Sequence, residues 1–206
     1  MHTGTRLADA LSRLVGSTLV HTHSRVVTTA TLLGMSSTGT GGPAVITRLS
    51  PNLLFAGGPT LVGGRYTPIG GPEALYLGSS ERVANAEWSS GLVELFPGRP
   101  LPPKTVFQAR VTIKRALDLS LEAIQIDLGT NDLELNSPWR SITDPPTQVL
   151  GLAIHQIGLF SAIRYRSTKE RRGYCVAIFP DRLTAGESVE VVDPAGHFSW
   201  SPLVGS

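Results

Sequence analysis

The sequence predicts an α+β fold in which mainly antiparallel strands are flanked by helices. Residues 106–119 alternate between apolar and polar side chains, which is typical of a half-buried strand. Residues 147–160 instead repeat apolar residues at helical spacing after a proline pair. Glycine (22 residues) and proline (15 residues) are both frequent, and this favours short strands and turns over a helical bundle.

The composition is that of one globular domain. The chain has 206 residues, of which 41% are hydrophobic and 17% are charged. Its net charge of +2 is too small to indicate nucleic-acid binding by bulk electrostatics. No apolar stretch is long enough to cross a bilayer, and the first residues lack the pattern of a secretory signal. We therefore expect a cytoplasmic protein that binds neither nucleic acid nor membrane.

The N-terminal part of the chain reads as an extension. Apolar residues at helical spacing predict a helix over residues 5–16, and weak alternation predicts one or two short strands within residues 17–33. Residues 35–43 are rich in Gly, Ser and Thr, which is typical of a flexible connector. We interpret residues 1–43 as an N-terminal extension and residues 44–206 as the main domain.

The first half of the main domain alternates strands with a loop and a helix. Residues 44–49 predict a strand, residues 56–64 a glycine-rich loop, and residues 74–77 a second short strand. Ser79 or Ser80 is a suitable N-cap for a helix over residues 81–96, which a Pro-Gly pair then ends.

The second half begins with the alternating strand. Its apolar face holds Phe107, Ala109, Val111 and Ile113, and its other face is polar. A short helix is predicted over residues 121–128, and a longer one over residues 147–160 with Val149, Ala153, Ile157 and Phe160 on one face. Residues 174–179 and 188–192 predict two further strands.

Three residues that are separated in the sequence are of the types that bind an anionic, ribose-containing ligand. Arg65 follows a glycine pair and can neutralise a diphosphate, while Tyr76 ends a short apolar run and offers a ring for a flat base. Glu87 lies on the predicted helix, where a carboxylate can bind ribose hydroxyls or stabilise a developing cation. Spacing alone does not identify the ligand.

Several short segments, from about residue 44 to residue 192, resemble the RES-domain family in order and spacing. They are Arg48 at the end of the first strand, Gly64-Arg65-Tyr66, Leu75-Tyr76-Leu77, Ala84 with Glu87, Leu135-Asn136-Ser137-Pro138-Trp139, residues 147–151, and Arg166-Ser167. The chain departs from the family pattern where Tyr66 replaces a tryptophan, where the proline before Trp139 is displaced, and where Arg166 replaces a proline.

The resemblance implies a fold of the ADP-ribosyltransferase type that uses NAD⁺ as substrate and needs no metal. It implies Arg65, Glu87 and Ser167 as catalytic residues, and Arg48, Arg65, Tyr66, Tyr76 and Ser167 as residues that bind the dinucleotide. Many such proteins are toxins of toxin–antitoxin pairs that consume NAD⁺, with a helix-turn-helix antitoxin as their usual partner. We therefore expect cleavage of the nicotinamide–ribose bond, by hydrolysis or phosphorolysis, and depletion of cellular NAD⁺.

Two other functions remain open from the sequence. One is a mono-ADP-ribosyltransferase that modifies a protein target, and the other is a catalytically silent binding or immunity module of the same fold. Each site residue also has an ordinary structural interpretation, such as a solvated turn for Arg65, a core aromatic for Tyr76 or a loop cap for Ser167. The acceptor, the oligomeric state and the role of residues 1–43 are not determined.

Other reactive side chains are interpreted as structural. The pair His21 and His23 has no cysteine or carboxylate close in sequence and is typical of a surface strand rather than a metal site. Cys175, the single cysteine, excludes an internal disulfide framework and lies in an apolar run. A buried thiol is expected there, not a nucleophile.

Overall fold

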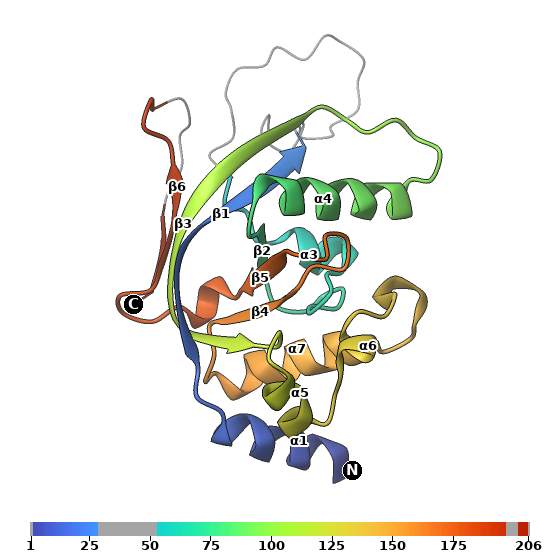
Figure 1. Cartoon of the computed structure of the whole chain (residues 1–206), viewed down its shortest axis with the longest axis vertical. Helices are drawn as coiled ribbons and strands as arrows, with labels where there is room; N and C mark the ends of the chain where they lie inside the picture. Colours follow the sequence, from blue (N-terminus) through green and yellow to red (C-terminus); the bar gives the residue numbers. More distant parts are fainter. Residues whose placement is uncertain (1, 29–52, 197–201, 206) are drawn as a thin grey trace.

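The computed structural model describes residues 2–28, 53–196 and 202–205 (Figure 1). Its helices are α1 (His2–Arg13), α3 (Gly58–Val62), α4 (Glu81–Leu95), α5 (Glu122–Leu128), α6 (Asp132–Leu135) and α7 (Pro146–Ile157), with short 3₁₀ turns at Trp139–Ser141 and Pro180–Arg182. Its strands are β1 (Ser17–Thr28), β2 (Leu75–Gly78), β3 (Lys104–Asp118), β4 (Ala162–Arg166), β5 (Tyr174–Ile178), β6 (Ser188–Val192) and β7 (Leu203–Val204).

The strands pair in a closed ring that runs β1–β2–β5–β4–β3 and back to β1. The ring closes where Ser24 of β1 pairs with Gly78 of β2. Strand β6 pairs with β3 outside the ring, and β7 pairs with β6. Among the described strands only the β3–β4 pair is parallel, so the predicted α+β class with mainly antiparallel strands is confirmed.

Strand β3 has the two faces that its sequence predicts. Phe107, Ala109, Val111 and Ile113 are buried, whereas Gln108, Arg110 and Lys114 are exposed. The strand is long enough to pair with β1 along one edge and with both β6 and β4 along the other. It therefore joins the ring to its outer strands.

Two apolar clusters form the core, one on each face of the central strands. Strand β5 shows the division, because Val176 and Ile178 belong to one cluster while Cys175 and Ala177 belong to the other. Alternate side chains of a strand point to opposite faces, so burial of both faces gives a continuous apolar run in the sequence. Cys175 is buried as expected.

Helix α4 begins where the sequence predicts. The Ser80 hydroxyl accepts the Val83 N–H at 3.3 Å and caps the first turn. Gly78, at the end of β2, allows the helix to approach closely, because a Cβ there would lie 2.6 Å from the Ala84 nitrogen. This contact fixes the position of α4 beside β2, and with it the position of Glu87.

Helix α7 buries a face that matches the predicted one only in part: Phe160 is buried and Ala153 and Ile157 pack against the core, but Val149 does not. The buried residues are Thr147, Leu150, Gly151 and Ile154, whereas Val149 is 50% exposed. The reason is the close packing of Gly151, where a Cβ would lie only 1.9 Å from the Tyr66 carbonyl oxygen. The helix therefore turns its smallest residue toward the loop that carries Arg65, and Leu150 and Ile154 are buried on the same face.

The described part of the N-terminal extension belongs to the same sheet. Residues 17–28 form one strand, β1, that pairs with β3 over most of its length, and Leu11 of α1 is buried in a core cluster with Leu150 and Ile154 of α7. In Figure 1, α1 lies beside α5 and α7 at one end of the molecule. The expected connector (35–43) and the strand at 44–49 lie outside the described residues, so the domain boundary stays a prediction.

Some elements were not predicted from the sequence. They are α3 within the expected glycine-rich loop, α6, β4 and β7. Within the described ranges, no helix combines the length and the apolar character needed to cross a membrane.

Candidate functional site

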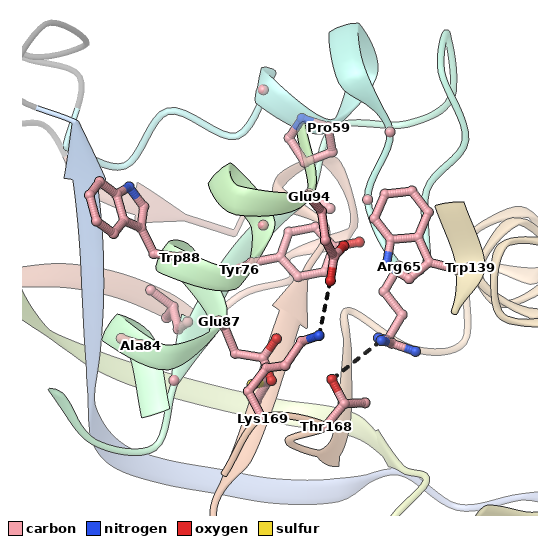
Figure 2. Close-up of a pocket in the computed structure, with 18 of the residues that line it drawn as sticks. Pro59, Arg65, Tyr76, Ala84, Glu87, Trp88, Glu94, Trp139, Thr168 and Lys169 are labelled. Atoms are coloured by element: carbon pink, nitrogen blue, oxygen red, sulfur yellow. Dashed lines mark hydrogen bonds and ion pairs between the residues drawn. The ribbon is translucent and has the colours of Figure 1, made fainter. Parts of the chain in front are cut away.

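A pocket of about 820 Å³ lies between helix α4, strand β2, the loop around Arg65 and the turn at residues 136–141 (Figure 2). Residues 24–26 of β1 and residues 168–169 also line it. Arg65, Tyr76 and Glu87 all line this pocket. In Figure 2, Glu87 and Arg65 enter the pocket from opposite sides, with the Tyr76 ring between them. The structure thus brings together three residues that the sequence singled out.

Arg65 is held by main-chain oxygens. Its Nη1 donates to the Leu135 carbonyl at 2.8 Å and to the Ser137 carbonyl at 3.2 Å, and its Nη2 lies 3.5 Å from the Thr168 hydroxyl. Among the described residues it has no ion pair with a carboxylate. Gly63, with φ of +76°, makes the turn before it possible. The guanidinium is oriented while its charge stays available to a ligand.

Glu87 is held by Ser167. The Ser167 hydroxyl donates to Glu87 Oε1 at 2.6 Å and itself accepts the backbone N–H groups of Lys169 and Glu170, at 3.2 and 3.0 Å. Ser167 is buried and does not line the pocket. It therefore positions the carboxylate, whereas the predicted direct contact of Ser167 with a ligand has no support in the geometry.

Tyr76 presents its ring to the pocket and anchors its hydroxyl in the wall. The hydroxyl accepts the Tyr66 backbone N–H at 3.0 Å and lies 3.3 Å from the Thr67 hydroxyl. Burial raises the pKa of Tyr76, so the phenol stays neutral at physiological pH. Gly64 leaves room for this arrangement, because a Cβ there would lie 2.6 Å from the Tyr76 hydroxyl oxygen.

Tyr66 needs a correction. The sequence predicts that it binds the dinucleotide, but its side chain is fully buried and does not line the pocket. Its ring packs edge-on against Tyr165 with centroids 4.8 Å apart. The physical reason is the approach of α7, which packs Gly151 onto the Tyr66 backbone and leaves its ring in the core. Tyr66 therefore supports Tyr76 through its backbone.

Arg48 lies outside the described residues, so its role stays a prediction. Within the described chain, no group of three or more His, Cys, Asp or Glu side chains is arranged to hold a metal ion. His23 is buried and packs edge-on against Tyr174, and burial lowers its pKa.

A tryptophan and an amide were missing from the predicted site. Trp139 lines the pocket, and Arg140 stacks on it at 4.1 Å from the ring centroid. The Gln148 amide donates to the Gly64 carbonyl at 2.9 Å and so ties α7 to the loop of Arg65. Both residues stand in segments that resemble the RES pattern, and that resemblance was the available signal.

An ion-pair cluster joins three segments at the side of the pocket. Glu94 of α4 accepts Lys169 Nζ at 3.0 Å and lies 3.4 Å from Arg140 Nε. Burial pushes the pKa of Glu94 upward, but hydrogen bonds from Lys169 and Ser90 and the nearby charges lower it overall. The three charged residues line the pocket, and the dashed line in Figure 2 marks the Glu94–Lys169 pair.

Comparison with known proteins identifies the class. The model of the RES domain family matches residues 47–201, and the chain belongs to that family. No curated protein matches the sequence.

Among solved structures, the chain is similar to one in the crystal structure of the M. tuberculosis MbcT–MbcA toxin–antitoxin complex. The TM-score is 0.57 at 14% sequence identity, over 91% of this chain and 90% of the other. At this identity the likeness establishes a shared fold.

Proposed function

We propose that this protein is a RES-type toxin that cleaves the nicotinamide–ribose bond of NAD⁺ and depletes the cellular pool. The observation behind the proposal is the shared pocket in which Arg65, Tyr76 and the Ser167-bound Glu87 meet. Membership of the RES family supports it. We expect the ADP-ribosyltransferase type of fold that the family implies.

The pocket suits a dinucleotide in size and chemistry. A volume of about 820 Å³ is in the upper range of small-molecule sites. Arg65 offers oriented N–H groups and a charge for the diphosphate. The rings of Tyr76 and Trp139 offer flat apolar surfaces for the bases.

Glu87 is placed to promote bond cleavage. Loss of nicotinamide gives the ribose an oxocarbenium-like character, as in glycoside hydrolysis. A carboxylate fixed beside the ribose stabilises that charge and orients the hydroxyls. Ser167 fixes Glu87 Oε1 by a hydrogen bond of 2.6 Å, so the side chain loses little freedom when the substrate binds. Water or phosphate then attacks the anomeric carbon.

An antitoxin partner is part of the proposal. One solved structure with a similar fold is a toxin–antitoxin complex. We expect a cognate antitoxin, of the helix-turn-helix type usual in this family, that neutralises this protein.

The test is nicotinamide release from NAD⁺ by the purified protein at neutral pH, with and without inorganic phosphate. ADP-ribose as product indicates hydrolysis, and a phosphorylated ADP-ribose formed only with phosphate indicates phosphorolysis. A labelled protein band from labelled NAD⁺ would instead indicate ADP-ribosyl transfer. Intact NAD⁺ in every assay, together with normal NAD⁺ levels in cells that express the protein, would refute the proposal.

A further inference from the structure

Arg25 is a pocket residue that lies outside the matched family region. It stands on β1, before residue 47 where the family match begins, and lines the same pocket as Arg65. Its Nη1 donates to the Leu53 carbonyl at 2.9 Å and its Nη2 to the Phe55 carbonyl at 2.6 Å. These bonds fix the guanidinium against the segment that leads into α3.

The charge of Arg25 has no carboxylate partner among the described residues. Burial lowers the pKa of Arg25 to about 10, so the side chain remains protonated at neutral pH. Arg25 is only partly buried and has no counter-ion among the described residues, so its charge is available to an anionic ligand.

Arg25 and Arg65 are presented in the same way. Each guanidinium is held by two main-chain carbonyls, and each has five N–H donors of which the described contacts use only some. The β1 ribbon borders the pocket on the left of Figure 2, whereas Arg65 enters from the right. Arg25 belongs to β1 and Arg65 to the loop between α3 and β2, so two oriented cations from different elements line the pocket.

We propose that Arg25 is a second phosphate-binding residue of this pocket. A planar guanidinium with free N–H groups suits the oxygens of a phosphate, to which it can donate two parallel hydrogen bonds. The identity of the ligand rests on the proposed function. The phosphate belongs either to the diphosphate of the dinucleotide or to inorganic phosphate that acts as the acceptor.

The test compares Arg25→Gln with Arg25→Lys by calorimetric titration of ADP-ribose and, separately, of inorganic phosphate. We expect Arg25→Gln to weaken binding of one of these probes at least tenfold, and Arg25→Lys to weaken it less because the charge remains. Loss for ADP-ribose indicates the diphosphate, and loss for inorganic phosphate alone indicates the acceptor. Equal losses in Gln and Lys, or no change with either probe, would overturn the proposal.

Arg115→Gln is the control. Arg115 also donates to main-chain carbonyls, to Gly158 at 3.0 Å and to Arg182 at 2.5 Å, but it pairs with Glu187 at 3.6 Å and does not line the pocket. We expect unchanged affinity for both probes. Because the titration needs no turnover, a protein that binds ADP-ribose through Arg25 without cleaving NAD⁺ would support this proposal and refute only the proposed function.

Crystallography of the wild-type protein provides a second test that does not depend on the folding of a variant. A crystal structure of the wild-type protein with ADP-ribose, and one with inorganic phosphate, would show where the phosphate oxygens lie. A phosphate oxygen within hydrogen-bond distance of the Arg25 guanidinium in either structure supports the proposal. Phosphates bound only at Arg65 would refute it.

Discussion

The two sides of the pocket treat charge differently. On the α4 side, ion pairs connect the helix to its neighbours. Arg82 of α4 pairs with Glu170 of the 167–173 loop, and Glu94 of α4 pairs with both Lys169 of that loop and Arg140 of the 139–141 turn. On the opposite side and on β1, Arg65 and Arg25 are held by carbonyl oxygens, with the Thr168 hydroxyl as a further contact of Arg65, and neither pairs with a described carboxylate.

The charges paired with carboxylates hold segments of the pocket wall together, whereas the unpaired charges remain available to bind a ligand. Exposed ion pairs contribute little to stability, but they can hold a loop in place. An arginine oriented by carbonyls keeps its full charge for an incoming anion. Glu87 is the counterpart on the α4 side, because the Ser167 hydroxyl that donates to it is neutral and not a cation. The unpaired groups are therefore the ones whose loss should cost activity.

The largest effect is expected for Glu87→Gln. The variant loses the carboxylate that stabilises the developing charge, so we expect kcat to fall roughly a hundredfold or more, or about 3 kcal/mol. The measurement is nicotinamide release under saturating NAD⁺. Glu81→Gln, an exposed residue in the first turn of the same helix, is the control and should leave kcat unchanged. Equal rates in the two variants would contradict the assignment of Glu87.

Arg65→Lys tests the other side. Lysine keeps the charge but cannot reach both carbonyls and a phosphate, and a hydrogen bond to a charged group is worth about 1.5–3 kcal/mol. We expect KM for NAD⁺ to rise about tenfold or more. Arg82→Lys, whose charge is paired with Glu170 on the surface, should not change KM. A KM effect in Arg82→Lys as large as that in Arg65→Lys would remove the distinction between paired and unpaired cations.

Ser167→Ala tests how Glu87 is positioned. The variant removes the donor to Glu87 and the acceptor of two backbone N–H groups, so we expect about tenfold lower kcat and about 1–2 kcal/mol lower free energy of unfolding. Combining it with Glu87→Gln should add little to the loss in kcat, because both changes act through one group. Fully additive losses would mean that Ser167 acts independently of Glu87.

Glu94→Gln should slightly strengthen NAD⁺ binding, whereas the preceding variants reduce activity or binding. Without the carboxylate, Lys169 and Arg140 present uncompensated charge at the pocket. An exposed pair is worth about 0.2–1 kcal/mol, so we expect KM for NAD⁺ to fall by a factor of about 2–5 at low ionic strength. The gain should disappear in high salt. Higher KM in the variant would show that the cluster shapes the pocket more than it neutralises charge.

Local patterns predicted the elements whose environment is regular. The alternation of residues 106–119 and the cap at Ser80 were sufficient for β3 and for the start of α4. Strand β4 was missed because its position depends on its pairing with β3 and β5, and such tertiary contacts have no local signature in a five-residue segment. The predicted face of α7 matched the buried one only in part, because the close contact of Gly151 with the Tyr66 backbone also determines which side of the helix is buried.

The sequence allowed prediction only of site residues that lie in family motifs. Arg65, Tyr76 and Glu87 do meet, whereas Tyr66 was misplaced because a motif does not say in which direction a side chain points. Arg25 was missed because it lies on a strand that no motif covers. Only the closure of the ring, in which β1 pairs with both β2 and β3, brings Arg25 to the pocket.

The smallest effect on activity is expected for Glu187→Gln, which lies on neither side of the pocket. Its Oε1 accepts the Ser161 hydroxyl at 2.7 Å and the Lys114 N–H at 2.8 Å, and its Oε2 accepts the Thr184 N–H at 2.8 Å. In the variant, an NH₂ group replaces one carboxylate oxygen and would face hydrogen-bond donors that lose their acceptor. We therefore expect the free energy of unfolding to fall by about 2 kcal/mol. The kcat for NAD⁺ should not change.

The pH dependence of unfolding distinguishes this buried carboxylate from the pocket residues. Burial raises the pKa of Glu187, but the hydrogen bonds from Ser161, Thr184 and Lys114 lower it overall, below its ordinary value of 4.5. Because the folded pKa is depressed, the stabilisation is complete above pH 4.5 and is lost as the pH falls through the folded value. Denaturant titrations between pH 7 and acid should therefore show a steeper loss of stability in the wild type than in Glu187→Gln. Parallel pH profiles would show that the fold does not stabilise the charged form of this carboxylate over its neutral form, and would contradict the lowered pKa.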